Sequence, residues 1–512
     1  MTQRKNLVWL CLNAISQGLI FSDLNHASKT KPEFFGLFLF PIHFDNFLTI
    51  QRKTIMQNIY DYTISHHVAQ ISQYRANRVL PTDLAVTSTA GRILSLRVHR
   101  NIIFFDLHED GQFVQCGIRR SIAPVAFEYF ESNIARGNIV WISGVWGTTS
   151  SGEVTLFVDD LHLVSANLEM IGDLQEGFNN TGRDLRELDL MLNPQVTERF
   201  MQRSRIIRAI REQLHGLDYM EVETPVIQTV ASGSQATPFT TYVHATDTQA
   251  VLRIAPETYL VRLLAGGLSR IFEIGHSFRN EGISPRHNPE FCMIEFYETF
   301  SNMNQTIELT QTMLQNCMRV AQSDISQVPY GEHVLNFSEF GRYTVAEALV
   351  HFLGWTQENA FNQEYLQDYL TSHNITNTMP SENVAWLQYM VFDNFVEHLL
   401  IQPTFITDLP IEASPLAYSR DGQTTRRFEM FCAGRELANG FEQVLSYDEQ
   451  VTRFDFQATI AGRDNAMEAD LQYLNTLRYG LPNLSGCGIG IDRLIMLATN
   501  TQHIRDVILY PL

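Results

Sequence analysis

The sequence of 512 residues is long enough for two or three domains, each with a substantial hydrophobic core. Apolar residues make up 45% of it, and no apolar run reaches the roughly 18 residues of a transmembrane helix, so we expect no membrane-spanning segment. The formal net charge of -19 excludes a broadly basic nucleic-acid-binding surface, and any such contact needs local patches of arginine.

Cysteine and lysine are distributed unusually along the chain. The cysteines are scattered and form no CxxC pair, which fits the reducing cytoplasm and argues against a disulfide framework or a zinc site (Cys11, Cys116, Cys292, Cys317, Cys432 and Cys487). Lysine occurs only near the N-terminus, at Lys5, Lys29, Lys31 and Lys53. Average composition predicts about 25 lysines in the remaining chain, so chance does not explain their absence.

Residues 1–55 differ from the rest, because they hold all the lysine and an aromatic cluster, FFGLFLFPIHF. Arg4 and Lys5 precede an apolar stretch, which leaves a signal peptide open, but Asn13 and Ser16 interrupt that stretch. We interpret these residues as an extension that is not part of the native fold, joined to a protein that starts at Met56. Residues 56–87 are then predicted to be a helical lead-in.

Five short strand-like runs follow within residues 88–166, and a helical stretch, APVAFEYFESNI, interrupts them. Turn residues separate the runs, for example Asp110-Gly111 and Ser151-Gly152. This order is typical of an OB-type barrel, a nucleic-acid-binding fold, although another small barrel would give a similar pattern. Residues 167–186 contain three glycines and few apolar residues, which predicts a linker.

A helix and a strand are predicted to open the second domain. Ile207, Ile210 and Leu214 share one helical face, Gly216 ends the helix, and a strand at residues 220–223 stops before Pro225. A second helix begins near residue 256 with an acidic first turn. Residues 301–400 are predicted to be mostly helical.

A long-looped antiparallel hairpin is predicted between residues 271 and 297, with loop signals at Gly282, Pro285 and Pro289. The period of two places four side chains on one face of the outgoing strand, and we expect Arg279 and Glu281 on the corresponding face of the incoming strand (Phe291, Met293, Glu295 and Tyr297). Arg286 and His287 lie in the loop. This group of side chains indicates a nucleotide site, because it offers cations for phosphate, an aromatic ring for a base, and carboxylates for an amine or a metal.

Two further stretches carry candidate chemistry. In RFEMFCAGRELANGFEQ (427–443), a turn at Ala433-Gly434 predicts a hairpin in which Glu429 and Glu436 converge on one face. Two converging carboxylates are costly unless a cation such as Mg²⁺, carried by a triphosphate, joins them. In SGCGIGIDRLIMLATN (485–500), a glycine-rich strand leads into a helix that begins near Arg493, which suits an anionic ligand.

These stretches resemble a known family. F-R-N-E-G-I-S-x-R-H-N-P-E-F, at residues 278–291, resembles motif 2 of class II aminoacyl-tRNA synthetases, subclass IIb, in its lysine-type form. The helix and strand that end at Pro225 resemble motif 1, which forms the dimer interface in such enzymes. The stretch around Arg493 resembles motif 3, and the resemblance spans roughly residues 88–512.

The resemblance implies roles for individual residues. It implies that Arg279 holds the α-phosphate, that His287 and Arg493 hold the outer phosphates, that Phe291 stacks on adenine and that Glu281 also contacts ATP, with Arg279 and Arg493 catalytic. Glu429 and Glu436 would hold Mg²⁺. The amino-acid pocket would comprise Gly233, Glu257, Glu295, Tyr297, Asn439, Phe441 and Gln443, although the family normally has Glu at the last position. Anticodon-binding residues would be Phe104, Gln115 and Glu153.

We therefore expect an α+β protein in which an OB-fold barrel (88–166) precedes a class II catalytic domain (187–512) with an antiparallel sheet flanked by helices. The implied function is ATP-dependent activation of lysine and its transfer to tRNA by a cytoplasmic homodimer. The alternatives are a paralogue that acylates a protein such as an elongation factor, an enzyme for another amino acid, and a non-catalytic tRNA-binding regulator. Protein-acylating relatives lack the barrel and carry Ala where this chain has Gly488. A non-catalytic regulator would be expected to lose motif arginines or magnesium-binding acids, and this chain keeps them.

Overall fold

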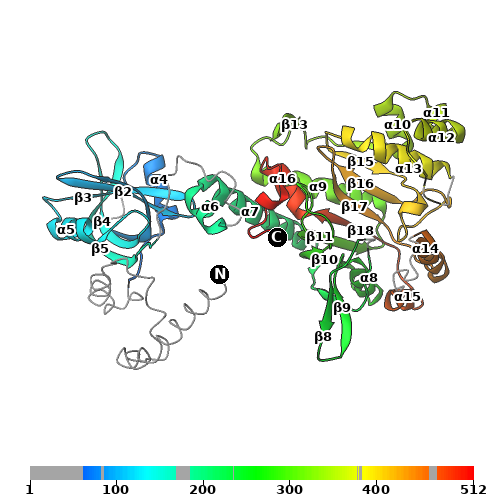
Figure 1. Cartoon of the computed structure of the whole chain (residues 1–512), viewed down its shortest axis with the longest axis horizontal. Helices are drawn as coiled ribbons and strands as arrows, with labels where there is room; N and C mark the ends of the chain where they lie inside the picture. Colours follow the sequence, from blue (N-terminus) through cyan, green and yellow to red (C-terminus); the bar gives the residue numbers. More distant parts are fainter. Residues whose placement is uncertain are drawn as a thin grey trace, which may run out of the picture.

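The computed structural model describes residues 62–81, 86–168, 185–233, 236–377, 379, 383–460 and 470–512. The predicted extension (1–55) lies outside these residues, as does most of the predicted linker (167–186). A barrel and a larger domain lie at opposite ends of the molecule, with helix α7 (Pro194–Gly216) between them (Figure 1). None of the helices among these residues combines the length and apolar character that a membrane crossing needs.

The N-terminal domain is a closed barrel with the strand order β1-β2-β3-β5-β4. This confirms the predicted barrel, including the helix inserted before β4. Of the predicted lead-in (56–87), the described part contains helix α4. The elements are α4 (Val68–Ala76), β1 (Thr87–Val98), β2 (Ile102–Glu109), β3 (Gln112–Arg119), α5 (Pro124–Asn133), β4 (Ile139–Thr148) and β5 (Val154–Ser165).

Alternation along the strands fills the barrel. Ile103, Phe105 and Leu107 of β2 point inward and are fully buried, whereas the residues between them face outward. Val68 and Ile71 of helix α4 join this core. The turn between β2 and β3 has positive φ angles at both of its central residues, which favours the Asp-Gly pair found there.

The second domain is built on an eight-stranded sheet with the order β14-β15-β16-β17-β18-β11-β10-β6. The pairs at its two edges, β14 with β15 and β10 with β6, are parallel, and the pairs between them are antiparallel. The strands are β6 (Met220–Glu221), β10 (Arg270–Phe278), β11 (Glu290–Thr299), β14 (Gly341–Thr344), β15 (Thr404–Thr407), β16 (Arg427–Phe431), β17 (Glu436–Glu442) and β18 (Leu484–Gly490).

Helices and two small sheets surround this sheet. The small sheets comprise β7 (Ile227–Gln228), β9 (Thr248–Leu252) and β8 (Thr240–Val243), and β12 (Val328–Tyr330) with β13 (His333–Leu335). The helices are α6 (Arg186–Leu192), α7, α8 (Glu257–Ala265), α9 (Met303–Ala321), α10 (Val345–Leu353), α11 (Gln357–Phe361), α12 (Gln363–Ser372), α13 (Val384–Phe395), α14 (Tyr447–Ile460), α15 (Leu471–Leu477) and α16 (Ile491–Ala498). Short 3₁₀ turns occur at Glu397–Leu399, Ile411–Ala413 and Ile504–Asp506.

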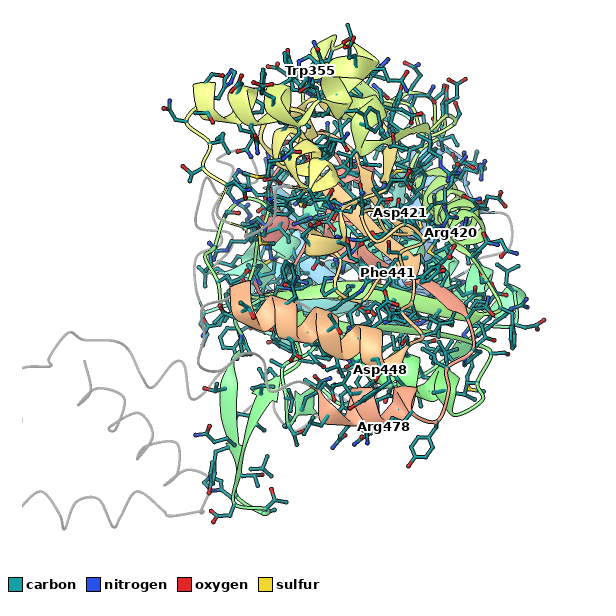
Figure 2. The ribbon with its side chains drawn as sticks, turned by 90° about the vertical axis from the view of Figure 1, so that its right-hand side faces the viewer. Trp355, Arg420, Asp421, Phe441, Asp448 and Arg478 are labelled. Atoms are coloured by element: carbon teal, nitrogen blue, oxygen red, sulfur yellow. The ribbon has the colours of Figure 1, made fainter. Side chains whose placement is uncertain are left out.

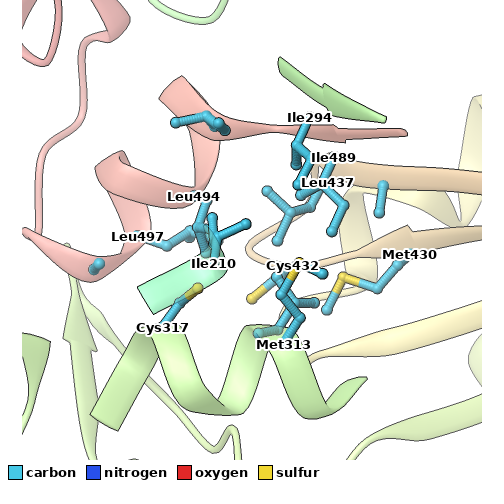
Figure 3. Packing of buried hydrophobic residues seen from close by; sticks show 14 of the residues in the cluster. Ile210, Ile294, Met313, Cys317, Met430, Cys432, Leu437, Ile489, Leu494 and Leu497 are labelled. Atoms are coloured by element: carbon cyan, nitrogen blue, oxygen red, sulfur yellow. The ribbon is translucent and has the colours of Figure 1, made fainter. Parts of the chain in front are cut away.

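One face of the sheet packs on helices α7, α9 and α16 to form the main core. Figure 3 shows Ile210 of α7, Met313 of α9 and Leu494 of α16 gathered against Ile294 and Ile489 of the sheet. Because side chains alternate across a strand, the residues next to Ile294 and Ile489 must point to the opposite face. That opposite face carries the candidate site.

The structure corrects one detail of the predicted hairpin. Strand β10 ends at Phe278, so Arg279 and Glu281 lie in the loop and not on the face of the strand, as predicted. The Arg279 backbone N–H donates to the Pro289 carbonyl at 2.8 Å, which closes the base of the loop. The second predicted hairpin has the expected register, with Phe431 opposite Glu436, and a bulge follows Met430.

Candidate active site

A cavity of about 350 Å³ opens on the face of strands β11, β17 and β18 that points away from the main core. The loop between β10 and β11 covers one end of it, and the start of helix α8 forms the other. Phe441 of β17 lines it, and Figure 2 shows this residue above helices α14 and α15. Most predicted site residues line this one cavity (Gly233, Glu257, Arg279, Glu281, His287, Phe291, Glu295, Tyr297, Glu436, Asn439, Phe441 and Arg493).

Glycines on β18 make room for the side chains of the neighbouring strand. Gly486 lies opposite Tyr297 and Gly488 lies opposite Glu295. A Cβ atom added at Gly486 would lie 2.1 Å from the Tyr297 ring, and one at Gly488 would lie 3.2 Å from the Met293 side chain. The glycine-rich sequence therefore lets β11 side chains lie flat over the backbone of β18.

Two buried carboxylates form one end of the cavity. Glu257 is 7% exposed and Glu295 is 4% exposed. Burial raises the pKa of Glu295 to about 7, and the Tyr297 hydroxyl, which donates to Glu295 at 2.9 Å, opposes that rise in pKa. Burial and the neighbouring Glu295 raise the pKa of Glu257 well above its ordinary value. Among the described residues, neither carboxylate has a cationic side chain within ion-pair distance, which makes this end suited to a cationic group.

Gln443 lies behind this end of the cavity. The sequence predicts it as a pocket residue, but the structure places it outside the cavity lining, 2% exposed. Its Nε2 donates to the Tyr473 hydroxyl at 2.8 Å, and its amide also hydrogen-bonds Glu257, which lowers the pKa of that carboxyl. Gln443 therefore contacts a pocket carboxylate and is not itself a wall of the cavity.

Positive charge gathers at the other end. The guanidinium of Arg279 lies 5.1 Å from the centroid of the Phe291 ring. Arg493 donates to the Glu436 carbonyl and lies 3.4 Å from His287 Nε2. Burial and Arg493 lower the pKa of His287. Among the described residues, neither Arg279 nor Arg286 has a carboxylate within the 4.0 Å of an ion pair, so these cations are available to an anionic ligand.

The two predicted metal ligands differ in their surroundings. The Glu436 side chain lines the cavity and is 43% exposed. Glu429 is buried, pairs with Arg427 and lies outside the lining of the cavity. Burial raises the pKa of Glu429 to about 7, Arg427 opposes this, and the neighbouring Glu436 adds to it.

This donor set fits Mg²⁺ that a phosphate ligand carries in. Glu429 and Glu436 supply only oxygen donors, and within the described ranges no group of three His, Cys, Asp or Glu residues could hold a metal ion. Mg²⁺ is commonly held by one or two carboxylates and substrate phosphates, with several of its own waters. Because the neighbouring Glu436 raises the pKa of Glu429, such a cation would stabilise the ionised form of Glu429.

Sequence reasoning missed Arg427, which pairs with Glu429 from the start of β16. Its Nε donates to Asn439 Oδ1 at 2.9 Å, and its Nη1 donates to the Ala413 carbonyl at 2.8 Å. The residue stands two positions before Glu429, so strand alternation places both on one face. That alternation was the available signal.

The predicted anticodon residues lie together on the outer face of the barrel. Gln115 is buried, accepts a hydrogen bond from Arg97 at 3.0 Å and donates to Thr155 at 2.7 Å. Glu153 accepts from Arg75 of helix α4 at 2.6 Å. Phe104 lies on strand β2, and the Arg97 guanidinium lies 5.9 Å from the centroid of its ring.

Comparisons with known proteins agree with both domains. The family described as tRNA synthetases class II (D, K and N) matches residues 179–512, and the family described as OB-fold nucleic acid binding domain matches residues 87–164.

Similar curated proteins cover most of the chain. A lysine--tRNA ligase of Neisseria gonorrhoeae (strain NCCP11945) is 41% identical over 382 residues, which cover 73% of this chain and 76% of that protein. A lysine--tRNA ligase of Nitrosomonas europaea is 38% identical and covers 84% and 87%. One of Chromobacterium violaceum is 36% identical and covers 88% and 92%. The chain therefore belongs to the class II tRNA synthetases of the D, K and N group, and its barrel is an OB-fold.

Proposed function

We propose that this protein is a lysine--tRNA ligase, which activates lysine with ATP to lysyl-adenylate and passes the lysyl group to the 3′ end of tRNA(Lys). The observation that carries the proposal is the chemical asymmetry of the cavity. One end holds Glu257 and Glu295, which are buried and form no ion pair with any residue that the structure describes, and the other holds Arg279, Arg286 and Arg493. Such a cavity suits a ligand pair that is cationic at one end and polyphosphate at the other.

The amino acid would lie between β11 and β17. The substrate's ammonium groups would face Glu257, Glu295 and the Tyr297 hydroxyl, since each can accept or share a hydrogen bond there. Asn439 and Phe441 of β17 line the same part of the cavity. The carboxylate would then point toward Arg279, at the junction of the two ends.

In the first step, a carboxylate oxygen of lysine bonds to the α-phosphorus of ATP, and the bond to the pyrophosphate oxygen breaks. Arg279 would neutralise charge at the α-phosphate, and its face-on contact with the Phe291 ring would hold it in place. His287 and Arg493 would hold the outer phosphates, and Glu281 would contact the ATP end of the cavity. Positioning and fixed charge account for catalysis of this kind, without a covalent nucleophile on the enzyme.

Glu429 and Glu436 would hold Mg²⁺ when ATP is bound, and the cation would supply charge neutralisation for the leaving pyrophosphate. The protein's own contribution is to keep both carboxylates close and Glu429 oriented through Arg427.

The barrel supports tRNA as the acceptor of the lysyl group. Phe104 lies on its outer face, which also carries the buried Gln115 and the partly exposed Glu153, and an aromatic ring with amide and carboxylate groups suits an unpaired base. Acylation of a protein is not favoured, because that reaction does not require a domain that binds tRNA. Protein-acylating relatives carry Ala at the position of Gly488. The methyl group of an alanine there would contact the side chains of Met293 and Glu295 in the pocket.

We also propose a homodimer through the motif 1 region. Strand β6 forms an edge of the large sheet, and apolar side chains near it are exposed, with Met220 at 54% and Ile227 at 55%. An exposed apolar sheet edge is usually covered by a partner. Sedimentation of the purified protein would test this.

The test of the function is ATP–pyrophosphate exchange with each of the twenty amino acids, followed by charging of tRNA with the preferred one. We expect exchange with lysine and lysyl-tRNA formation. Exchange with a different amino acid would overturn the substrate, and exchange without tRNA charging would overturn the acceptor.

A further inference from the structure

One row of paired residues runs across all five strands on the outer face of the barrel. The register pairs Arg97 of β1 with Phe104 of β2, Phe104 with Gly117 of β3, and Gly117 with Phe157 of β5. Val145 of β4 completes the row opposite Phe157. The backbones of the two phenylalanines therefore lie on either side of a glycine, two strand spacings or about 10 Å apart.

Gly117 opens the space that both rings share. A Cβ atom at this position would lie 3.3 Å from the Phe104 ring and 3.3 Å from the Phe157 ring. Phe157 also lies close to Gly147 of β4, where an added Cβ would be 3.0 Å from its ring. Its neighbours Leu156 and Val158 point into the barrel core, so Phe157 itself contributes little to that core.

Arg119 covers the outer face of Phe157. Its guanidinium carbon lies 3.7 Å from the centroid of the ring, the shortest such contact among the described residues. No carboxylate in the described part of the chain lies within ion-pair distance of Arg119. A guanidinium held this close over a ring has its other side available to a ligand, and RNA bases stack on aromatic rings and on arginine planes alike.

We propose that the Arg119–Phe157 pair is a second base-stacking position for single-stranded RNA, next to the one expected at Phe104, and that it takes the neighbouring base of the tRNA anticodon loop. This inference rests on the proposed function, because it needs the barrel to bind tRNA. The pairing of a stacking plane with a fixed positive charge selects a nucleic acid, since the base gains contact area and the phosphate gains a cation.

The experiment measures binding of a fluorescent anticodon stem-loop RNA by anisotropy. Phe157→Leu removes the ring, and Arg119→Gln removes the charged plane without touching the barrel core. Arg120→Gln is the matched control, because it removes the same charge at the next residue, where the side chain contacts Phe127 and Glu131 instead. Lysine-dependent ATP–pyrophosphate exchange reports whether the catalytic domain is intact.

We expect Phe157→Leu and Arg119→Gln each to weaken RNA binding roughly tenfold, in line with the loss of one stacked base. We expect Arg120→Gln to change binding less than twofold and every variant to keep the wild-type exchange rate. Abasic nucleotides placed at each loop position in turn then identify the partner base. With an abasic nucleotide at one loop position, and at no other, Phe157→Leu should not weaken RNA binding further. That position should be adjacent to the one identified in the same way with Phe104→Leu.

Wild-type protein that does not bind the stem-loop would overturn the proposed tRNA function of the barrel. RNA binding by wild type that is unchanged in both variants would overturn the second stacking position and leave that function standing. Weaker binding that is coupled to no single base would also overturn it, because it would indicate a structural role for Phe157.

Discussion

The amide at position 443 is the residue at which this chain departs from the family pattern. Gln443 donates to Tyr473 and hydrogen-bonds Glu257 from behind the pocket. A carboxylate in its place would lie against Glu257, and the two would repel unless a proton or an ammonium group lay between them.

We therefore expect Gln443→Glu to lower the KM for lysine several-fold with little change in kcat, and to lower the melting temperature of the free protein. Tyr473→Phe is the control, since it removes the partner of Gln443 without adding charge. The lysine assignment would be contradicted if Gln443→Glu left the KM for lysine unchanged or raised it, and if the parent protein preferred another amino acid.

The raised pKa of Glu295 makes lysine binding depend on pH. In the folded protein this carboxyl ionises near pH 7 and not near its ordinary 4.5. The folded state therefore binds the proton more tightly than the unfolded state, and its stability falls as pH rises from about 4.5 to about 7, by on the order of 3 kcal/mol. Burial is the main cause of this raised pKa, Glu273 adds to it, and Arg253 and Arg279 oppose it. Glu257 also faces this carboxyl.

An ammonium group needs the ionised form of Glu295, so the affinity for lysine should rise up to tenfold per pH unit below pH 7 and then level off. Calorimetry without ATP measures this without interference from His287. Glu295→Gln should bind lysine weakly at every pH. Affinity that is flat between pH 6 and 8 in the parent protein would contradict the assignment.

The paired acids of β16 and β17 allow a cleaner test than sequence reasoning suggests. From sequence alone, removing either carboxylate should relieve repulsion. In the structure Glu429 also neutralises the half-buried Arg427, so Glu429→Gln leaves a cation without its partner. Glu436→Gln is the better variant, because this side chain is partly exposed and only 3.9 Å from Arg493.

We expect Glu436→Gln to abolish magnesium-dependent pyrophosphate exchange while the melting temperature stays within about two degrees of the parent's, since surface substitutions change stability little. Exchange at the parent's rate would contradict the metal assignment.

At the scale of elements, the period of two in the sequence predicted which side chains of a strand share one face. Phe291, Met293, Glu295 and Tyr297 follow a strict period of two, and all of them line the cavity. The positions of loop residues, and of residues that lie behind the cavity wall, were harder to predict from the sequence. Arg279 follows the last residue of β10, where no period applies, and Gln443 follows the end of β17. Whether such a residue faces a cavity or lies behind it depends on elements far along the chain, here α15 with Tyr473.

Strand β18 offers a test of the close packing of the sheet. Gly486→Ala would put a methyl group 2.1 Å from the Tyr297 ring, and displacing that ring should cost about 1–3 kcal/mol of stability. It should also remove lysine-dependent exchange, because Tyr297 holds Glu295. Gly490→Ala is the control, since an added Cβ there meets nothing closer than 3.8 Å. Equal melting temperatures and exchange rates in the two variants would contradict this account.

At the scale of the whole molecule, the absence of lysine after residue 53 has a chemical consequence for the proposed reaction. An aminoacyl-adenylate is an electrophile that acylates free amines, whereas arginine stays protonated and does not react. A chain without lysine side chains offers its own product few targets.

Replacing several exposed arginines by lysine, chosen from those that form no ion pair with a described residue, should therefore give an active enzyme that modifies itself (for example Arg78, Arg100 and Arg420). Mass spectrometry after incubation with ATP and lysine would detect lysyl adducts in this variant and not in the parent. If the variant carries no adducts, the depletion of lysine has a different cause.

The place of β18 in the sheet sets the order in which the enzyme becomes competent during synthesis. This strand lies between β11 and β17, so the middle of the sheet is completed by residues that leave the ribosome after both of its neighbours. Until Leu484–Gly490 enters, β11 and β17 each lack a hydrogen-bonded partner along one edge, and the β18 residues that line the cavity are missing. A nascent chain therefore has an incomplete site for ATP and the adenylate, and the open edges of β11 and β17 must be kept from aggregating until translation of this segment is finished.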